Sequence, residues 1–242
     1  MEERIGYTGP WPRGSLLEKL SDKARDDLLS RGRNRQYEAG EVLVHQGATD
    51  THAVVLLDGY TKVTAVGEEG TVTFLALRVG GDVIGELAAM DSRPRIATVT
   101  AGGALTARVL GQEDLRRFVE LHPDAGLHLS SSIGRKLRGA VSKLVDFHGR
   151  DVPVRVARVL FELALKYGRP AAGGVELAVS LTQPELAGLV SASEPSVHRA
   201  LASLRREGLI ATSYRRFRVL DMSGLGGIAG ISETRERRGS IP

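Results

Sequence analysis

Between residues 37 and 109 the sequence alternates short apolar segments with glycines, and this pattern restricts the fold more than any other feature of the chain. The apolar segments lie at residues 42–45, 53–57, 62–66 and 72–77. Glycines stand between or beside them at positions 40, 47, 59, 67, 70, 80 and 81. Short strands separated by turn glycines at this spacing are typical of a β-sandwich or jelly roll. We therefore expect a β jelly roll in the first half of the chain.

Helical patterns flank this region. A short amphipathic helix is predicted over residues 16–29 and another over residues 112–120. A longer helix over residues 125–150 carries apolar side chains spaced 4, 3, 4 and 3 apart, at Ile133, Leu137, Ala140, Leu144 and Phe147. This spacing is typical of a coiled-coil seam. From spacing alone, the helix either packs on the core of its own domain or forms the seam of a homodimer.

A second globular unit is predicted after Val152 and Pro153. A helical period over residues 156–164 is followed by a breaker run at residues 168–174, a strand at 175–179, two short helices and a hairpin. The expected class is α+β, in four parts. They are a jelly-roll sensor domain (15–124), a dimerisation helix (125–150), a winged helix-turn-helix domain (151–223) and a flexible tail (224–242) that is rich in Gly and then in Arg and Glu.

Two helices of the second unit have the pattern of a DNA-reading helix pair. Residues 182–185 supply a hydroxyl N-cap at Thr182, a proline in the first turn and an acid at the third position. Ser193 can cap a second helix over residues 194–206. The N-terminal part of its outward face would present Glu194, Ser196, His198 and Arg199 to the major groove.

The hairpin that follows this helix pair has a basic tip. Tyr214, Arg215 and Arg216 lie there, as in a wing that contacts phosphates. Charge supports the interpretation, because residues 132–242 carry 18 Lys and Arg against 10 Asp and Glu, whereas residues 1–131 carry 15 against 19. A basic second half favours double-stranded DNA as a partner.

Other function classes receive little support. The chain has no cysteine, which excludes disulfides and iron–sulfur clusters. No Ser/His/Asp set, paired carboxylates, P-loop or metal-ligand spacing stands out, so we expect no enzyme, catalytic residue, metal or cofactor. The longest apolar run, residues 53–57, is too short to cross a membrane, and the first residues lack the apolar core of a signal peptide. A cytoplasmic protein without a membrane partner is expected.

Residues 182–210 resemble the helix-turn-helix of the cyclic-AMP receptor protein/FNR superfamily. The resemblance implies that Arg199 reads guanine through O6 and N7, that Thr182 and Ser193 touch phosphates, and that Gln183 belongs to the same surface. The receptor protein itself has Arg and Glu where this chain has Glu194 and Pro195, so a different operator is expected.

Residues 37–47 and 80–88 resemble the jelly roll of cyclic-nucleotide-binding domains, and residues 85–99 resemble its phosphate-binding cassette. The resemblance implies that Arg95 pairs with a cyclic phosphate at the Gly85 turn and that Glu86 accepts a hydrogen bond from the ribose. The amides of Leu87 and Ala97 would complete the site. On spacing alone, a structural pair without a ligand explains Arg95 and Glu86 better, and only the resemblance to the cassette favours a nucleotide.

Two positions depart from the cyclic-AMP regulators. Ile96 stands where they usually have Ser or Thr. The hydroxyl pair that contacts the base from the dimer helix is missing, because its counterparts are Ala140 and Val141 or, in another alignment, Leu137 and Arg138. Whether the effector is cyclic AMP, cyclic GMP or neither stays open.

The predicted function is a homodimeric transcription regulator that binds a palindromic operator and is controlled by a cyclic nucleotide. Two alternatives stay open. The same architecture would bind DNA without a nucleotide or with another effector, or a cyclic-nucleotide-binding module would act through protein partners. The resemblance implies RNA polymerase as a further partner, through residues 171–174. These residues are only alanine and glycine, so their composition gives no support for activation of transcription.

Overall fold

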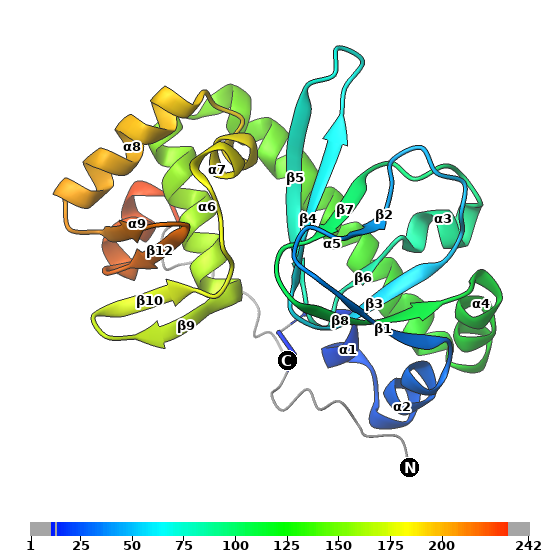
Figure 1. Ribbon diagram of the computed structural model, residues 1–242. Coiled ribbons are helices and arrows are strands. Elements are labelled where there is room, and N and C mark those ends of the chain that lie inside the picture. Colours follow the sequence, from blue (N-terminus) through cyan, green and yellow to red (C-terminus); the bar gives the residue numbers. More distant parts are fainter. Residues whose placement is uncertain (1–10, 13, 232–242) are drawn as a thin grey trace. The chain divides into compact units, whose positions relative to one another are not determined.

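The computed structural model describes residues 11, 12 and 14–231 and divides into two compact units, residues 1–139 and 140–242 (Figure 1). The helices of the first unit are α1 (Leu16–Lys19), α2 (Asp22–Ser30), α3 (Glu86–Asp91), α4 (Gln112–Leu121) and the beginning of α5 (Pro123–Gly149). Its strands are β1 (Arg33–Tyr37), β2 (Val42–Val44), β3 (Ala53–Asp58), β4 (Tyr60–Val66), β5 (Val72–Val79), β6 (Val83–Ile84), β7 (Thr98–Ala101) and β8 (Leu105–Leu110).

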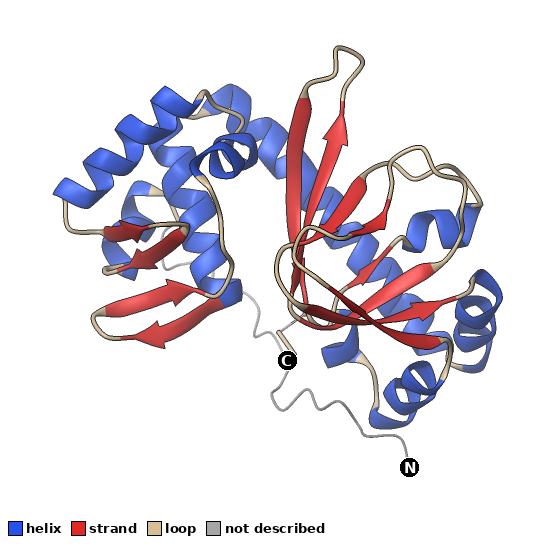
Figure 2. Cartoon of the chain, in the orientation of Figure 1, coloured by secondary structure: helices blue, strands red, loops and turns tan. Residues whose placement is uncertain are grey.

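These strands form two four-stranded sheets, in the orders β1-β8-β3-β6 and β2-β7-β4-β5, and every neighbouring pair is antiparallel (Figure 2). The order within each sheet is non-sequential, as expected for a jelly roll. With the helices of the second unit, the α+β class predicted from the sequence is confirmed.

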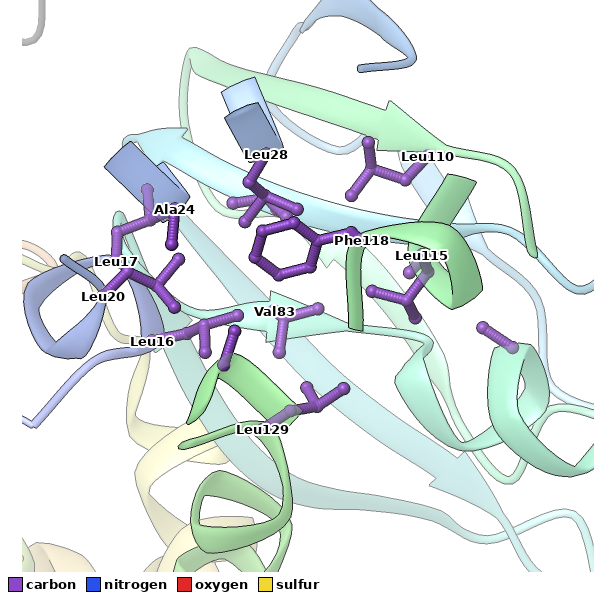
Figure 3. Close-up of a cluster of buried hydrophobic side chains, with 14 residues drawn as sticks. Leu16, Leu17, Leu20, Ala24, Leu28, Val83, Leu110, Leu115, Phe118 and Leu129 are labelled. Atoms are coloured by element: carbon purple, nitrogen blue, oxygen red, sulfur yellow. The ribbon is translucent and has the colours of Figure 1, made fainter. Parts of the chain in front are cut away.

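The strand β3 separates two hydrophobic cores. Val54 and Leu56 belong to the core between the sheets, whereas Ala53 and Val55 belong to a second core under the helices. In that second core, residues of α1, α2, α4 and α5 surround the ring of Phe118 (Figure 3). Successive side chains of a strand point to opposite faces, so a strand buried on both faces needs an unbroken apolar run. This requirement explains the run at residues 53–57.

Two local features of the first unit differ from the prediction. The single helix expected over residues 16–29 is split into α1 and α2, because Ser21 accepts a hydrogen bond from the amide of Ala24 and begins a new helix. The strand β1 was missed, since four of its five residues are polar and exposed. It is held by backbone pairing with β8 along its whole length.

The helix α5 changes its surroundings along its length. Near its beginning, Ala125, Leu129 and Ser132 are buried against the sensor core. Further along, Leu137 is 64% exposed and Leu144 is 66% exposed. Of the remaining predicted seam residues, Ile133 is half-buried and Ala140 is exposed, while the side chain of Phe147 lies outside the described part of the chain.

The second unit contains α6 (Val152–Tyr167), α7 (Gln183–Val190), α8 (Glu194–Arg206) and α9 (Met222–Ile228). Its strands are β9 (Gly168–Ala171), β10 (Gly174–Leu177), β11 (Ile210–Ser213) and β12 (Arg216–Val219), in the order β11-β12-β10-β9. Buried side chains of α6, α7 and α8 form the core. Among the described residues, no helix is both long and apolar enough to cross a membrane.

The prediction of a flexible tail that begins at residue 224 is wrong for its first residues. Residues 222–228 form α9, whose N-cap Asp221 accepts a hydrogen bond from the amide of Gly224 and whose Leu225 is fully buried. Three glycines lie close to this leucine and made the segment look unstructured, but tertiary packing outweighs their poor helix propensity. Residues 232–242, the rest of the predicted tail, lie outside the described residues.

Candidate functional site

The cassette of the first unit begins at a glycine turn. Gly85 has a φ of +73° and is the N-cap of α3. A Cβ atom at this position would lie 2.5 Å from Nη1 of Arg95 and 3.0 Å from the carbonyl oxygen of His52. The turn therefore needs glycine for two reasons, the left-handed backbone and the close approach of the arginine.

The backbone of Arg95 is fixed by the loop that follows β2. Its amide donates to the carbonyl of Ala48, and its carbonyl accepts from the amide of Gly47, both at 2.8 Å. This two-way pairing brings together segments that are far apart in the sequence. It sets the direction in which the arginine side chain leaves the loop.

The guanidinium of Arg95 is buried, and the residue is only 5% exposed. It donates to the Asp50 carboxylate from both Nε and Nη2, to the carbonyl of Gly85 from Nη1 at 2.8 Å, and to the carbonyl of His52 from Nη2 at 2.6 Å. The Asp50 side chain is partly exposed. A phosphate entering from the solvent side would therefore compete with Asp50 for a cation that is already oriented.

Glu86, the first residue of α3, is paired elsewhere. Its carboxylate accepts a hydrogen bond of 2.7 Å from Nζ of Lys136 on α5, and the same ammonium donates to the carbonyl of Val83 at 2.6 Å. Burial lowers the pKa of Lys136, and the attraction of Glu86 opposes this shift. The pair therefore holds an oriented carboxylate in the interior.

The predicted cassette residues come together, although Arg95 and Glu86 do not pair with each other. Ala97 is buried, Leu87 is 37% exposed and Ile96 is 70% exposed. Sequence reasoning missed Asp50 and Lys136, the two partners of the buried charges. Each is distant in sequence from the residue it pairs with, and no local pattern singles it out.

The Gly85 turn yields a first prediction. Gly47→Ala places a methyl group in open space at a φ of +80°, so it should cost only the left-handed backbone, about 1 kcal/mol of unfolding free energy. Gly85→Ala should cost about 2 kcal/mol more, because its methyl group displaces Arg95. Urea denaturation of both variants measures the difference. Equal losses would mean that Arg95 gives way without cost.

In the second unit, α7 begins at a capping box. The Thr182 hydroxyl accepts from the amide of Glu185 at 3.3 Å, and the Glu185 carboxylate accepts from the amide of Thr182 at 2.8 Å. Gln183 is exposed in the first turn. At the other end, Arg155 of α6 donates to the carbonyls of Val190 and Ser191. These contacts satisfy both ends of a short helix.

The helix α8 spans the range predicted from the sequence, Glu194–Arg206. Its inner face buries Val197, Ala200, Leu201 and Leu204. Near its beginning, the outer face exposes Glu194, His198 and Arg199. The hydroxyl of Ser193 does not cap the helix but lies 3.0 Å from that of Ser196, which accepts from Nη2 of Arg199 at 3.0 Å. The arginine is thus oriented along the exposed face before any partner binds.

The wing is the two-residue turn between β11 and β12. Arg215 has a φ of +59°, unusual for a residue with a side chain, and its guanidinium lies over the ring of the exposed Tyr214. Its carbonyl accepts from the amide of Leu181, next to the N-cap of α7. Arg216, predicted at the tip, begins β12 instead, where its exposed side chain lies near Glu176. Arg215 and Tyr214 therefore form the tip.

Comparison with known proteins gives matches for both units. Residues 34–122 match the cyclic nucleotide-binding domain family, and residues 154–228 match the Crp-like helix-turn-helix domain family. A CRP-like cAMP-activated global transcriptional regulator of Mycobacterium tuberculosis is 28% identical over 198 residues, which cover 82% of this chain and 88% of the relative. The cAMP-activated global transcriptional regulator CRP of Salmonella typhimurium is 27% identical over 197 residues, covering 81% and 93%.

Among solved structures, a CRP/FNR family transcriptional regulator from Thermus thermophilus is 25% identical, with a TM-score of 0.69. The match covers 82% of this chain and 98% of that structure. Two domain families in one chain and relatives aligned over nearly their whole length agree on one arrangement, a domain of the cyclic nucleotide-binding family followed by a Crp-like helix-turn-helix domain.

Proposed function

The chain belongs to the CRP/FNR superfamily of transcription regulators, and from this premise we propose that it is a homodimer that binds a palindromic operator when a cyclic nucleotide occupies its jelly roll. DNA binding and control by an effector follow from the family. The homodimer and the nucleotide are the parts that we propose. A regulator of this kind works in the cytoplasm, where it meets the chromosome.

One observation carries the nucleotide proposal. Two buried charges of opposite sign, Arg95 and Glu86, flank the Gly85 turn without pairing with each other. Burying two charges is costly, and a structural role would be met more cheaply by apolar side chains. A cyclic nucleotide would use both groups, with its phosphate on Arg95 and its ribose hydroxyl on Glu86. Calorimetric titration with cyclic AMP and cyclic GMP tests this, and the absence of heat with both would refute it.

The exposed apolar side chains of α5 support the homodimer. Leu137, Val141 and Leu144 are spaced 4 and 3 apart and are each more than half exposed. A monomer gains nothing from such a row in water, whereas a second copy of the helix would bury it. RNA polymerase is included as a partner on the family resemblance alone, because the turn at Ala172 and Gly173 offers no charged or aromatic side chain.

A second candidate function has an observation in its favour. Asp50 already satisfies the Arg95 guanidinium, together with two carbonyl groups. A regulator that binds its operator without nucleotide would keep this pair as a fixed element. Operator affinity measured with and without nucleotide separates the two candidates, because only the first requires the affinity to change.

Arg199 yields a second prediction. Arg199→Ala should weaken binding to the selected operator by about 1–3 kcal/mol, because a two-pronged contact with guanine is lost. Bulk DNA should bind almost as before. Arg206→Ala is the matched control, since Arg206 is exposed in the last turn of the same helix. The control should weaken all sequences slightly and equally, and fluorescence anisotropy with operator and scrambled duplexes measures both. If Arg199→Ala lowered the affinity for operator and scrambled duplexes equally, Arg199 would contact phosphates rather than read a base.

A further inference from the structure

The hydroxyl of Thr61 has no partner. Thr61 lies in β4, its side chain is fully buried, and Oγ1 forms no hydrogen bond with the described part of the chain. Two residues further along the same face, Val63 packs against the core between the sheets. A buried hydroxyl without a partner loses its hydrogen bonds to water and gains nothing in return. Valine would fill the same space without this cost, so the hydroxyl needs another explanation.

Arg78 lies directly opposite Thr61. The antiparallel register of β4 and β5 pairs the two residues, so their side chains leave the same face of the sheet. Arg78 is half-buried, and its side chain donates to the carbonyl of Leu77 at 2.8 Å. Among the described residues it forms no ion pair. Most of its donors are therefore available to a bound molecule.

This Thr61–Arg78 pair adjoins the cassette. Arg78 and Val83 flank the tight turn between β5 and β6, in which the amide of Asp82 donates to the carbonyl of Val79 at 3.0 Å. The carbonyl of Val83 accepts a hydrogen bond of 2.6 Å from Nζ of Lys136, which also donates to Glu86. Repulsion from the Arg78 guanidinium adds to the larger effect of burial in lowering the pKa of Lys136. Arg78, Lys136 and Glu86 are thus one electrostatic cluster. Arg95 lies at the other end of the cassette, beyond Gly85. A nucleotide with its phosphate on Arg95 and its ribose on Glu86 would direct its base toward Arg78.

We infer that Thr61 and Arg78 bind the base of the effector and that they select guanine. An arginine side chain only donates hydrogen bonds. Guanine presents two neighbouring acceptors, O6 and N7, whereas adenine has a donor, N6, in place of O6. Arg78 therefore matches guanine and opposes adenine, and the Thr61 hydroxyl can either donate or accept. This inference rests on the proposed function and adds which cyclic nucleotide is bound.

The test is calorimetric titration of the full chain with cyclic GMP and cyclic AMP. The wild type should bind cyclic GMP at least about tenfold more tightly. Arg78→Leu should remove this preference, and Arg78→Lys should reduce it, because an ammonium cannot contact both acceptors in the arginine geometry. If the wild type binds the two nucleotides equally, or if Arg78→Leu keeps the preference, the inference is wrong while the proposed function stands. If neither nucleotide binds, both fail.

Thr61→Val provides a second readout. The substitution removes an unpartnered hydroxyl at nearly constant volume, so the melting temperature of the free protein should rise while cyclic GMP binds about fivefold more weakly. The matched control is Thr100→Val on the neighbouring strand β7, which should leave nucleotide affinity unchanged. Thr100 is half-buried and lies next to Ala101, the residue paired with Thr61. A lower melting temperature for Thr61→Val with unchanged affinity would assign Thr61 a structural role and overturn its part in the site.

Discussion

Replacing Leu137 and Leu144 together by aspartate is expected to convert the protein from a dimer to a monomer and to weaken operator binding by at least about 100-fold. The two leucines are largely exposed on α5, one heptad apart. In a dimer, two aspartates from each helix would be buried as like charges without partners. A monomer would also lose the gain from binding two half-sites at once, which commonly exceeds a hundredfold. Light scattering after size exclusion and a mobility-shift titration measure the two effects.

Leu165→Asp is the control for this variant. Leu165 is a similarly exposed leucine on α6, outside the predicted seam. It should leave both the dimer and the operator affinity intact. A wild-type protein that is monomeric at micromolar concentration, or a double variant that stays dimeric, would contradict the proposed seam.

Arg95→Ala should lower cyclic nucleotide affinity by about 100-fold or more. Two charge-assisted hydrogen bonds to a phosphate contribute about 1.5–3 kcal/mol each. The fold should survive, because Asp50 is partly exposed and can be hydrated once its partner is gone. Some loss of stability is expected from the unpaired carbonyls of Gly85 and His52. Calorimetric titration gives the affinity, and thermal unfolding shows how much of the change is structural.

The matched control is Arg93→Ala, which removes an exposed arginine from the same loop. Nucleotide affinity should be almost unchanged in this variant. Equal effects of the two substitutions would indicate general electrostatic attraction rather than a phosphate site. Retained affinity in Arg95→Ala would place the ligand elsewhere, and the DNA-binding proposal would not be affected.

The elements that were predicted most accurately from the sequence are those in which local chemistry and packing agree. The bounds of α8 follow from a proline in its first turn and leucines at helical spacing. The strand β3 was predicted because two-sided burial leaves a continuous apolar run. In both cases neighbouring residues carry the whole signal.

The features that could not be predicted from the sequence are those that depend on contacts between distant segments of the chain. The polar strand β1 forms because its backbone pairs with β8. The glycine-rich helix α9 forms because Leu225 is buried. The partners Asp50 and Lys136 follow the same rule. Arg95 pairs with the carboxylate of Asp50, 45 residues earlier in the chain, and Glu86 pairs with the ammonium of Lys136, 50 residues later. Only the folded jelly roll, with α5 packed against it, brings these groups together, and no local pattern encodes such contacts.

The position of β3 between two cores has a consequence for how the sensor comes apart. Ala53 and Val55 belong to the helical cluster, and Val54 and Leu56 belong to the sandwich interior. Sliding the strand by one residue would exchange these two sets, so neither core can adjust its register alone. Both cores are closed by the same strand, so β3 cannot lose its register without opening both. We therefore expect the sensor domain to unfold cooperatively as a single unit, with the helices and both sheets losing their structure together.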